Sequence, residues 1–462
     1  MNSLLLSRLK AIIQEYFQIT GLDFHISMTL LMRTWAILAG AVTVILLPNY
    51  LNPVEQGFYY TYSSILSLQI FFELGLTGVI ITLVSYETAA LTLQTNNTIT
   101  GNTKSISRVQ DIFSQFTKWY KLLSVLFWIF ASLVGFIFFN KNNHDSVGIK
   151  WVPQWICLVS LAALNLNLSA RLAFIEAIGK VGNVARLRVV QSILGFLIMW
   201  YFMYAGAGLW IVIVVPLISV CASYLWLRKY DNVFNYNHQP LEAETSKTNW
   251  SKDIFPLQWR IALSWISGYF IFNLFVPVAF RYFGPVEAGK LGIGITILNA
   301  VNTLSLSWAI AKQPVLTSYV ARGERQKLRS LSRLIMKQVV ITNLALSTAV
   351  ITGVFVASRF GYELVQRIAS VDVLIWIAIG GVINNFIAAG AIYMRAHREE
   401  PMVMASVGGS VLTLAVIWMS NGANIGRMMM LNMTIICLVG LPWFLFILYR
   451  FNQRYESANP HS

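Results

Sequence analysis

Charge is scarce in this sequence of 462 residues. Charged residues make up 11% of the chain, whereas about 25% is usual in a soluble domain. Hydrophobic residues make up 56%, and the mean hydropathy is +0.62. This composition leaves too few polar residues to cover a water-soluble core. It excludes a soluble globular protein and predicts an all-α polytopic membrane protein.

Cysteine and catalytic motifs are scarce as well. The three cysteines, Cys157, Cys221 and Cys437, each lie inside an apolar run, so the sequence indicates neither a disulfide framework nor a metal site. No histidine lies near a cysteine or a second histidine at the spacing of metal ligands. A Walker A motif is absent, which excludes ATP hydrolysis by that motif. We therefore expect no catalytic residues, no metal and no enzymatic activity.

Long hydrophobic runs, in contrast, are abundant. A membrane-spanning helix needs about 20 mainly apolar residues to cross ~30 Å of hydrocarbon. Twelve segments qualify: 27–48, 58–82, 119–139, 151–174, 186–204, 208–227, 258–280, 290–312, 335–357, 371–393, 402–420 and 428–449. The expected parts are an amphipathic N-terminus (1–26), a first lobe of six spans (27–227), a linker (228–257), a second lobe of six spans (258–449) and a tail (450–462).

The distribution of positive charge predicts the orientation. The net charge is +15, but the basic residues are not clustered as a nucleic-acid surface would require; they lie between apolar runs. If the N-terminus is cytoplasmic, the great majority of the 34 Lys and Arg residues fall in cytoplasmic segments. We therefore expect both termini in the cytoplasm and no nucleic-acid partner.

One motif occurs twice. "YLNPVEQGFYYTYSSI" begins at Tyr50 and "YFGPVEAGKLGIGITI" begins at Tyr282, and both contain Tyr-x-x-Pro-Val-Glu-x-Gly before the second span of a six-span half. "INNFIAAGAIYMRA", ending at Ala396, similarly matches a segment ending at Ala177. Chance similarity in apolar sequence is the alternative. Because six spans return the chain to the same side, true repeats would be parallel lobes with the substrate between them.

Two ionisable residues lie deep in predicted spans. Arg33 lies about 15 residues before the outer end of the first span, and Glu73 about 15 residues after the outer start of the second. At 1.5 Å per residue both fall ~22 Å below the outer boundary. Such residues are costly in a membrane and therefore informative. Arg33 is expected to attract a phosphate while Glu73 neutralises it or titrates; a static ion pair is the alternative.

Other polar side chains recur within the spans. They are Tyr62, Gln69 and Glu73 in the second span, Asn165 in the fourth, Asn299 and Asn302 in the eighth, and Asn384 beside Asn385 in the tenth. Hydroxyls, amides and aromatic faces recognise sugars, so the set favours a wet binding cavity. Each amide taken alone is as well explained by hydrogen bonds that hold helices together.

Further charged residues lie near the predicted inner ends of spans. Arg260 and Lys312 would face either a ligand or lipid phosphates, the latter by snorkelling. Glu176 and Arg395 occupy equivalent places in the two halves, which suggests a contact between lobes. The segment 101–125, basic and aromatic, suggests a helix at the lipid headgroups.

The sequence resembles a known family. The twelve-span layout, "FFELGLTGVIITLVS" along the second span and "AIGKVGNVARLRVVQSI" between the fourth and fifth are similar to lipid-linked oligosaccharide flippases. These are the polysaccharide transport branch of the multidrug/oligosaccharidyl-lipid/polysaccharide (MOP) superfamily, which includes bacterial O-antigen flippases. Its motifs are loose, but the resemblance covers essentially the whole chain.

The resemblance implies a function in the bacterial inner membrane. The substrate would be an undecaprenyl-diphosphate-linked oligosaccharide, moved from the cytoplasmic to the periplasmic leaflet by alternating access. Arg33, and less clearly Arg260 and Lys312, would meet the diphosphate, and Glu73 would couple transport to a proton or sodium gradient. No cofactor is implied; membrane lipids and the polymerase and chain-length proteins of the same pathway are implied partners.

Three other classes of membrane protein are alternatives to a flippase. An ion-coupled multidrug exporter of the same superfamily would show an acidic pocket, whereas this chain has more Arg and Lys than acid within its spans. A major-facilitator transporter would have a short basic loop after the second span, in place of the long polar segment 83–118. An enzyme of the pathway would need a large outer loop, and the expected outer loops are short.

Overall fold

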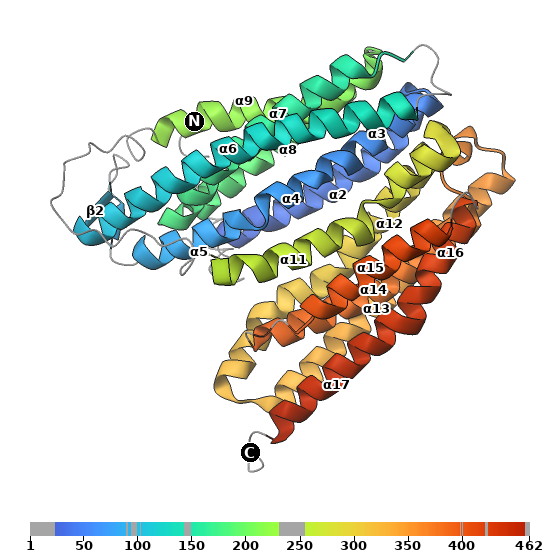
Figure 1. Cartoon of the computed structure of the whole chain (residues 1–462). Coiled ribbons are helices and arrows are strands. Elements are labelled where there is room, and N and C mark those ends of the chain that lie inside the picture. The colour runs from blue at the N-terminus through green and yellow to red at the C-terminus, as the bar shows by residue number, and fades with distance from the viewer. Residues whose placement is uncertain are drawn as a thin grey trace, which may run out of the picture. The chain divides into compact units, whose positions relative to one another are not determined.

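Helices make up nearly all of the computed structural model of the chain (Figure 1). The structure describes residues 24–88, 91–93, 99–101, 103–142, 149–230, 255–397, 399, 401–420 and 424–457. In hydrocarbon no water is present to satisfy backbone amides, so apolar runs favour helices, which satisfy them internally. Most of the expected N-terminal segment 1–26, and of the linker 228–257, lies outside the described residues.

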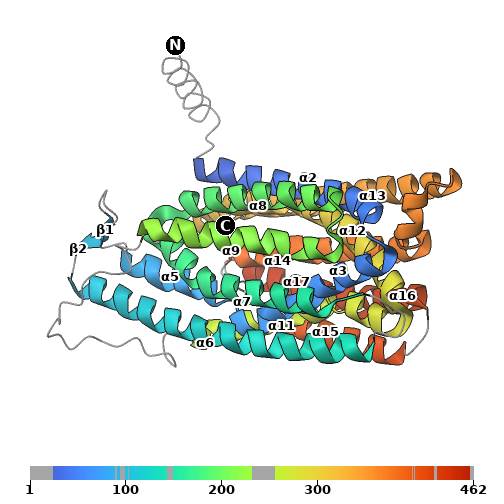
Figure 2. The ribbon, with the colours of Figure 1, turned by 90° about the horizontal axis from the view of Figure 1, so that it is seen from above.

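The first half of the chain forms helices and one small hairpin. The helices are α2 (Phe24–Tyr50), α3 (Pro53–Leu66), η1 (Ser67–Gln69), α4 (Ile70–Glu73), α5 (Leu76–Thr88), α6 (Thr103–Lys141), α7 (Val152–Ile175), η2 (Glu176–Lys180), α8 (Val181–Tyr204), η3 (Gly208–Ile213), α9 (Val214–Leu227) and η4 (Arg228–Tyr230). Strands β1 (Leu91–Leu93) and β2 (Ile99–Gly101) pair antiparallel between α5 and α6, as Figure 2 shows.

The described part of the second half is helical throughout. Its elements are α11 (Phe255–Phe272), α12 (Phe275–Arg322), α13 (Arg325–Arg359), η6 (Glu363–Arg367), α14 (Val371–Ala396), α15 (Val403–Met419), α16 (Ile425–Ile435), η7 (Ile436–Gly440) and α17 (Leu441–Ser457).

The expected number of spans agrees with these helices. Seven of the described helices are long and apolar enough to cross a membrane; a bent pair, Pro53–Glu73 with Leu76–Ser85, forms an eighth, and two more apolar helices are shorter. Two of the long segments each contain two helices, joined at non-helical residues that include Gly179 and Gly284. Counted in this way, the described residues hold twelve apolar helices, as predicted.

The helices differ from the expected segments in three places. The second span is not one straight helix, because it bends by 42° after Glu73. The segment 101–125 is helical from Thr103 as the first part of α6, which continues without a break to Lys141; its contact with lipid headgroups stays a prediction. The helix of the eighth span does not end at Lys312, since α12 continues through Pro314 to Arg322.

The chain divides into two compact units. The first comprises residues Met1–Ala39, Gly75–Ser132 and Ile156–Gln258. In this unit α8 packs on α9, and the Gln191 side chain donates to the Ser219 carbonyl at 3.0 Å and the Ser223 hydroxyl at 2.7 Å. The hydroxyls of Ser85 and Thr88 both donate to the Ala177 carbonyl, at 3.2 and 3.3 Å. These bonds tie the end of α5 to the π-helical turn η2.

The second unit comprises Gly40–Leu74, Leu133–Trp155 and Trp259–Ser462. Its central helix, α12, packs against α13 and α14 from its own half and against α3 from the first half. A cluster of aromatic rings fills the space beside α3: Phe58 contacts Phe139 and Phe280, with ring centroids 5.3 and 5.1 Å apart. The second unit thus contains helices from both halves of the sequence.

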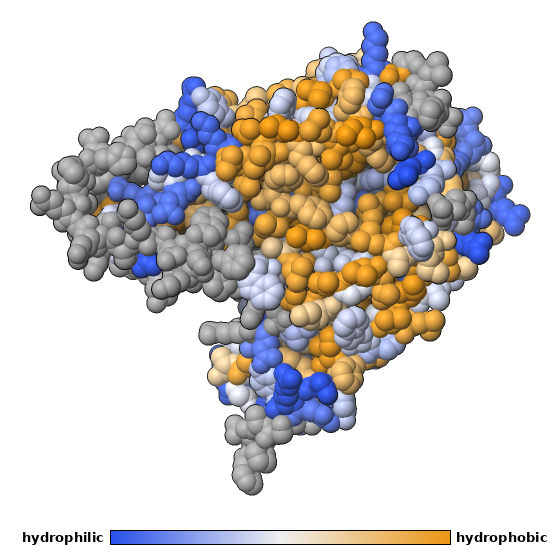
Figure 3. Space-filling model, viewed as in Figure 1, coloured by the Kyte–Doolittle hydropathy of each residue, from blue (hydrophilic) through white to orange (hydrophobic). Residues whose placement is uncertain are grey.

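Apolar side chains remain exposed along the helices. Leu133 and Ile137 on α6 are 56% and 63% exposed, and the visible face is dominated by hydrophobic residues between more polar ends (Figure 3). Large exposed apolar surface marks an interaction site for lipid or protein. Together with the helix lengths, it identifies the chain as a multi-pass membrane protein.

Candidate functional site

The first copy of the repeated motif starts a helix. Asn52 is the N-cap of α3: its side-chain oxygen accepts from the Glu55 amide at 2.8 Å, and the Glu55 carboxylate accepts from the Asn52 amide at 3.1 Å. Pro53 follows the N-cap, where its missing amide costs nothing. Pro-Val-Glu after asparagine is therefore a complete helix start, with the capping box in place.

The second copy also starts a helix, by a different route. Gly284 has φ 83°, a backbone conformation that glycine adopts readily, and Pro285 follows it. Glu287 forms an ion pair with Lys290 one turn later, at 2.7 Å. Both copies thus begin the helix that follows, and the final glycine of each motif lies on the second turn.

The two copies pack on each other. A Cβ atom built on Gly57 would overlap the Pro285 carbonyl, and one built on Gly289 would lie 2.9 Å from the Gly57 amide nitrogen. One turn further on, Gly292 lies against the ring of Tyr60. We call this crossing of α3 and α12 the motif contact. It is backbone against backbone, so the motif requires glycine for close approach between the halves.

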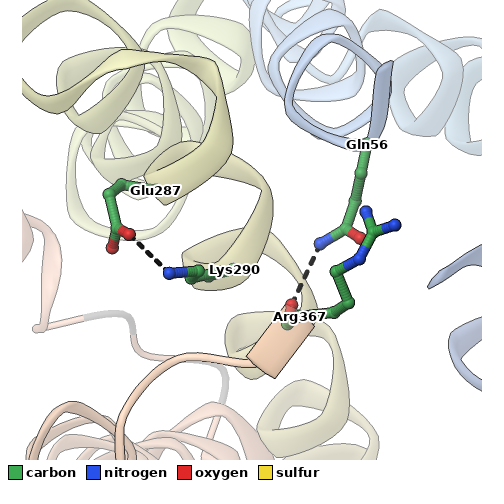
Figure 4. A network of polar contacts seen from close by, with 4 residues as sticks. All are labelled: Gln56, Glu287, Lys290 and Arg367. Atoms are coloured by element: carbon green, nitrogen blue, oxygen red, sulfur yellow. Dashed lines mark hydrogen bonds and ion pairs between the residues drawn. The ribbon is translucent and has the colours of Figure 1, made fainter. Parts of the chain in front are cut away.

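Hydrogen bonds to a third segment flank the motif contact. Gln56 is 1% exposed, and its side-chain nitrogen donates to the Arg367 carbonyl at 3.0 Å (Figure 4). Two residues on, the Ala369 amide donates to the Lys290 carbonyl at 3.1 Å. The turn between α13 and α14 therefore holds both α3 and α12. Figure 4 also shows the Arg367 side chain beside Gln56, where burial lowers the pKa of its guanidinium.

A polar cavity of about 340 Å³ lies next to this turn. Its polar lining groups are Glu287, Lys290, Ser370, Asp372 and Asn424, with Phe283 as an aromatic wall. Two carboxylates, an ammonium, a hydroxyl and an amide beside a ring can bind a ligand with many hydroxyl groups. Asp372, near the start of α14, thus shares a cavity with the second copy of the motif.

The bend in the second span lies directly after Glu73. Leu74 has φ 48° and ψ 32°, and Gly75 has φ 71°, so two consecutive residues are in the left-handed region. Broken helices within a membrane are tolerated where they are buried in protein or line a cavity, and they mark ion and substrate sites in transporters. The half-buried Glu73 is therefore at the position in this span where such chemistry is expected.

The three predicted basic residues differ in whether the structure describes their side chains. Arg33 lies on α2 and Arg260 on α11, but their side chains are outside the described residues. Lys312 is exposed on α12, ten residues before its end at Arg322. Of these three cations, the described structure therefore places the side chain of Lys312 alone.

Tyr62 lies in the packed interior beside α3. It is fully buried, its hydroxyl donates to the Trp151 carbonyl at 2.8 Å, and its ring contacts Trp155 at 5.1 Å. The expected stripe of Tyr62, Gln69 and Glu73 is also broken by the 3₁₀ turn η1. The sequence placed Tyr62 on a polar face from the period of a helix alone. In the structure the aromatic cluster beside α3 covers the Tyr62 side chain.

The amides divide into two groups. Asn302 joins a network: its side-chain oxygen accepts from Asn343 at 2.9 Å, and its backbone carbonyl accepts from Asn385 at 2.9 Å. Asn165 accepts from Ser219 on α9 at 3.0 Å. These amides hold helices together.

The second group of amides is accessible. Asn299 is exposed, whereas Asn384 and Gln69 are half-buried. Neither Asn384 nor Gln69 makes a side-chain hydrogen bond within the described part of the chain. Sequence reasoning missed Asn343, which is fully buried on α13, because a single Asn in a span looks the same whichever way it faces.

Glu176 and Arg395 are not seen as a pair. Glu176 forms an ion pair with Arg188, at 2.7 Å, within the first half of the chain. Arg395 lies exposed at the end of α14. The contact between lobes that their equivalence suggested thus stays a prediction for another conformation.

Solved structures similar to this chain are transporters. A lipid II flippase, MurJ, in an inward closed conformation has a TM-score of 0.62 at 12% identity, over 91% of this chain and 86% of that chain. A multidrug resistance MATE family transporter of the MOP superfamily, in an inward-facing conformation, has a TM-score of 0.57 at 11% identity, over 90% and 99%.

A third similar structure is a MOP superfamily transporter from Pyrococcus furiosus whose binding pocket is described as having reverse polarity; the TM-score is 0.53 at 13% identity, over 93% and 97%. No protein-family profile matches the sequence, and no curated protein is similar to it in sequence. At these identities the similarity shows the fold alone. The chain has the two-lobe, predominantly helical fold of MOP-type transporters, as the sequence predicted.

Proposed function

We propose that this chain is a flippase that moves an undecaprenyl-diphosphate-linked oligosaccharide, an O-antigen or related repeat unit, from the cytoplasmic to the periplasmic leaflet. The motif contact is the observation that carries the proposal. It joins the two halves through equivalent helix starts, in a fold that a lipid II flippase also adopts. A transporter that works by alternating access needs a contact between helices that closes one side of the substrate path and can separate. The motif contact is the proposed closure.

The chemistry of the motif contact suits a reversible closure. Gly57 and Gly289 meet without interlocking side chains, and Gln56 adds a hydrogen bond to the Arg367 carbonyl. The predicted orientation places this closure at the periplasmic side. Separation of α3 from α12 would then release the sugar outward, past the polar cavity that contains Glu287 and Asp372.

Substrate recognition is assigned to the remaining polar groups. Arg33 is the proposed partner of the diphosphate, with Arg260 and Lys312 at the inner boundary. Gln69, Asn299 and Asn384 are available for the sugar, whereas Tyr62, Asn165 and Asn302 serve helix packing. Glu73, at the break in the second span, is the proposed coupling acid for a proton or sodium gradient. Membrane lipids, the polymerase and the chain-length proteins of the pathway are the proposed partners.

The second candidate is an ion-coupled multidrug exporter. MATE transporters with this fold favour it, including one solved in complex with MaD3S, at a TM-score of 0.56 and 13% identity. The excess of Arg and Lys over acid within the spans argues for an anionic substrate instead.

Translocation in proteoliposomes tests the proposal. The native protein, Arg33→Ala, Glu73→Gln and the control Lys337→Ala, an exposed cation on α13, are reconstituted with undecaprenyl-diphosphate oligosaccharide. We expect leaflet exchange with the native protein and the control, loss with Arg33→Ala, and loss of gradient dependence with Glu73→Gln. Absence of exchange together with efflux of small organic cations would overturn the proposal in favour of the exporter.

A further inference from the structure

A second cavity, of about 200 Å³, lies at the opposite end of α12 from the motif contact. It is enclosed by the end of α12, the start of α13 and the ends of α14 and α17. Its polar lining residues are Tyr319, Arg325, Arg329, Tyr393, His397, Asn452 and Tyr455. About 30 residues of helix separate it from Gly292, which is ~45 Å at 1.5 Å per residue, so it is distinct from the transport closure.

The lining of this cavity is basic. Two guanidinium groups and an imidazole face it, together with phenol and amide groups, and no carboxylate is among its described lining residues. Two carboxylates close by in sequence have other partners: Glu399 accepts a hydrogen bond from the Tyr455 hydroxyl at 2.9 Å, and Glu324 forms an ion pair with Lys327 at 2.9 Å. Arginine side chains present several N–H donors in a fixed fork, which matches the oxygens of a phosphate.

The start of α13 adds a second indication of an anion. Arg325 is the first residue of this 35-residue helix, and Arg329 follows one turn later. The positive end of a helix dipole favours acidic residues; here the acid is the N-cap Glu324, which forms an ion pair with Lys327, and the first turn itself has none. The N-cap Glu324 also makes no capping bond through its side chain within the described structure. The two guanidinium groups add to the positive potential at this end of the helix dipole, and this potential favours an anion in the cavity.

The remaining walls are rigid. The His397 ring lies 4.5 Å from that of Tyr455 and 5.1 Å from that of Phe451, by ring centroids, and Nδ1 is 3.2 Å from the Tyr393 carbonyl. Tyr393 in turn donates to the Asn452 side chain at 3.0 Å. The carbonyl contact fixes the proton on Nδ1 when the ring is neutral, which sets the orientation of Nε2. A pre-organised wall lowers the entropy cost of binding.

From these observations we propose that this cavity binds a phosphate group. Its volume is below the ~300 Å³ at which pockets for whole drug-sized ligands begin, so it fits a phosphate and not an entire nucleotide or sugar chain. The phosphate belongs either to a lipid headgroup or to a small soluble anion. The predicted orientation places this end at the cytoplasmic leaflet, where both are present.

Binding to the purified full-length protein tests this site. The first probe is inorganic phosphate, titrated against the protein in neutral detergent. The second is phosphatidylglycerol in nanodiscs, compared with phosphatidylcholine and scored by native mass spectrometry of retained lipid. The variant is Arg325→Gln with Arg329→Gln. The matched control, Arg322→Gln with Arg333→Gln, removes the same charge from exposed positions that do not line the cavity.

We expect about a tenfold or greater loss of affinity in the cavity variant and no change in the control, since charge-assisted hydrogen bonds are lost in the cavity variant alone. Binding of phosphatidylglycerol alone identifies a lipid site, and binding of inorganic phosphate identifies a soluble ligand. Equal losses in both double variants, or no saturable binding of either probe, would overturn the proposal. The single variant Arg329→Gln, with a smaller expected loss, serves if the double variant does not fold.

Discussion

Gly57 lies directly against the backbone of Pro285, and these two residues belong to the two copies of one repeated motif. Gly57 ends the first copy, and Pro285 lies near the start of the second. The two helices that begin at the motif cross each other, and each has its motif glycine at the crossing. A duplicated sequence here produces a contact between its own copies.

Substitution of Gly57 tests how tight this contact is. A methyl group at Gly57 would overlap the Pro285 carbonyl, and neither backbone can move without shifting its helix. We expect Gly57→Ala to reduce the free energy of unfolding by about 1–3 kcal/mol, and to reduce transport. Thermal unfolding in detergent is the measurement. Gly268→Ala is the control, because a Cβ there meets nothing within 4 Å; equal effects of the two would contradict the close packing.

The hydrogen bond from Gln56 to the Arg367 carbonyl should set how readily the motif contact separates. Gln56→Met keeps the shape of the side chain and removes the donor, which costs about 1 kcal/mol, or roughly a fivefold change in the equilibrium. We expect faster maleimide labelling of a cysteine introduced at the buried Ala288. Gln115→Met, which removes a bond to Asp111 on α6, should leave the labelling rate unchanged.

Sequence reasoning predicted the helices better than it predicted their faces. Composition and apolar runs were enough for twelve spans, and the Pro-Val-Glu-x-Gly motif for the equivalence of Gly57 and Gly289. The period of a helix shows which residues share a face but not what that face meets. Tyr62 therefore lies in an aromatic cluster, and Asn302 in an amide network, where a cavity was expected.

The break after Glu73 and the mutual packing of the two motifs were missed for different reasons. Leucine is unfavourable in the left-handed region, so nothing at Leu74 indicated a bend; only Gly75 beside it permits one. The packing of Gly57 on Pro285 depends on the crossing of two helices from different halves, and one sequence does not contain that geometry.

The two groups of amides should respond differently to substitution. Asn343 is fully buried, donates to Asn302 and accepts from Ser347 at 3.2 Å, so Asn343→Ala leaves partners unpaired. We expect a loss of about 1 kcal/mol in stability, within the range of such bonds in membranes. Asn384→Ala should leave the unfolding midpoint unchanged while reducing oligosaccharide transport. An Asn343→Ala protein as stable as the native one would contradict the structural role.

His397 should make stability depend on pH. Desolvation lowers its pKa below the ordinary 6.5, against smaller opposite effects of the Tyr393 carbonyl and Glu399. Below pH 6.5 the unfolded chain binds a proton that the folded chain resists, so stability is fully present above this pH and falls as the pH decreases toward the folded pKa. His397→Phe keeps the ring packing and should remove the part of the loss of stability at low pH that is due to His397. Unfolding midpoints between about pH 7.5 and 5.5 give the comparison; identical slopes for the two proteins would contradict it.

The bend in the second span can be tested with two neighbouring glycines. Gly75 has φ 71°, so Gly75→Ala places a side chain in the left-handed region at a cost of about 1–2 kcal/mol. Gly78 is three residues further on in α5, where a Cβ atom would meet nothing within 4 Å, so Gly78→Ala is a matched control. We expect Gly75→Ala to reduce both the unfolding midpoint and transport, because the substitution disturbs the backbone beside Glu73, whereas Gly78→Ala should be neutral or slightly stabilising. Transport that survives Gly75→Ala at native rate, in a protein whose stability has fallen, would show that the bend serves packing and that Glu73 does not depend on it.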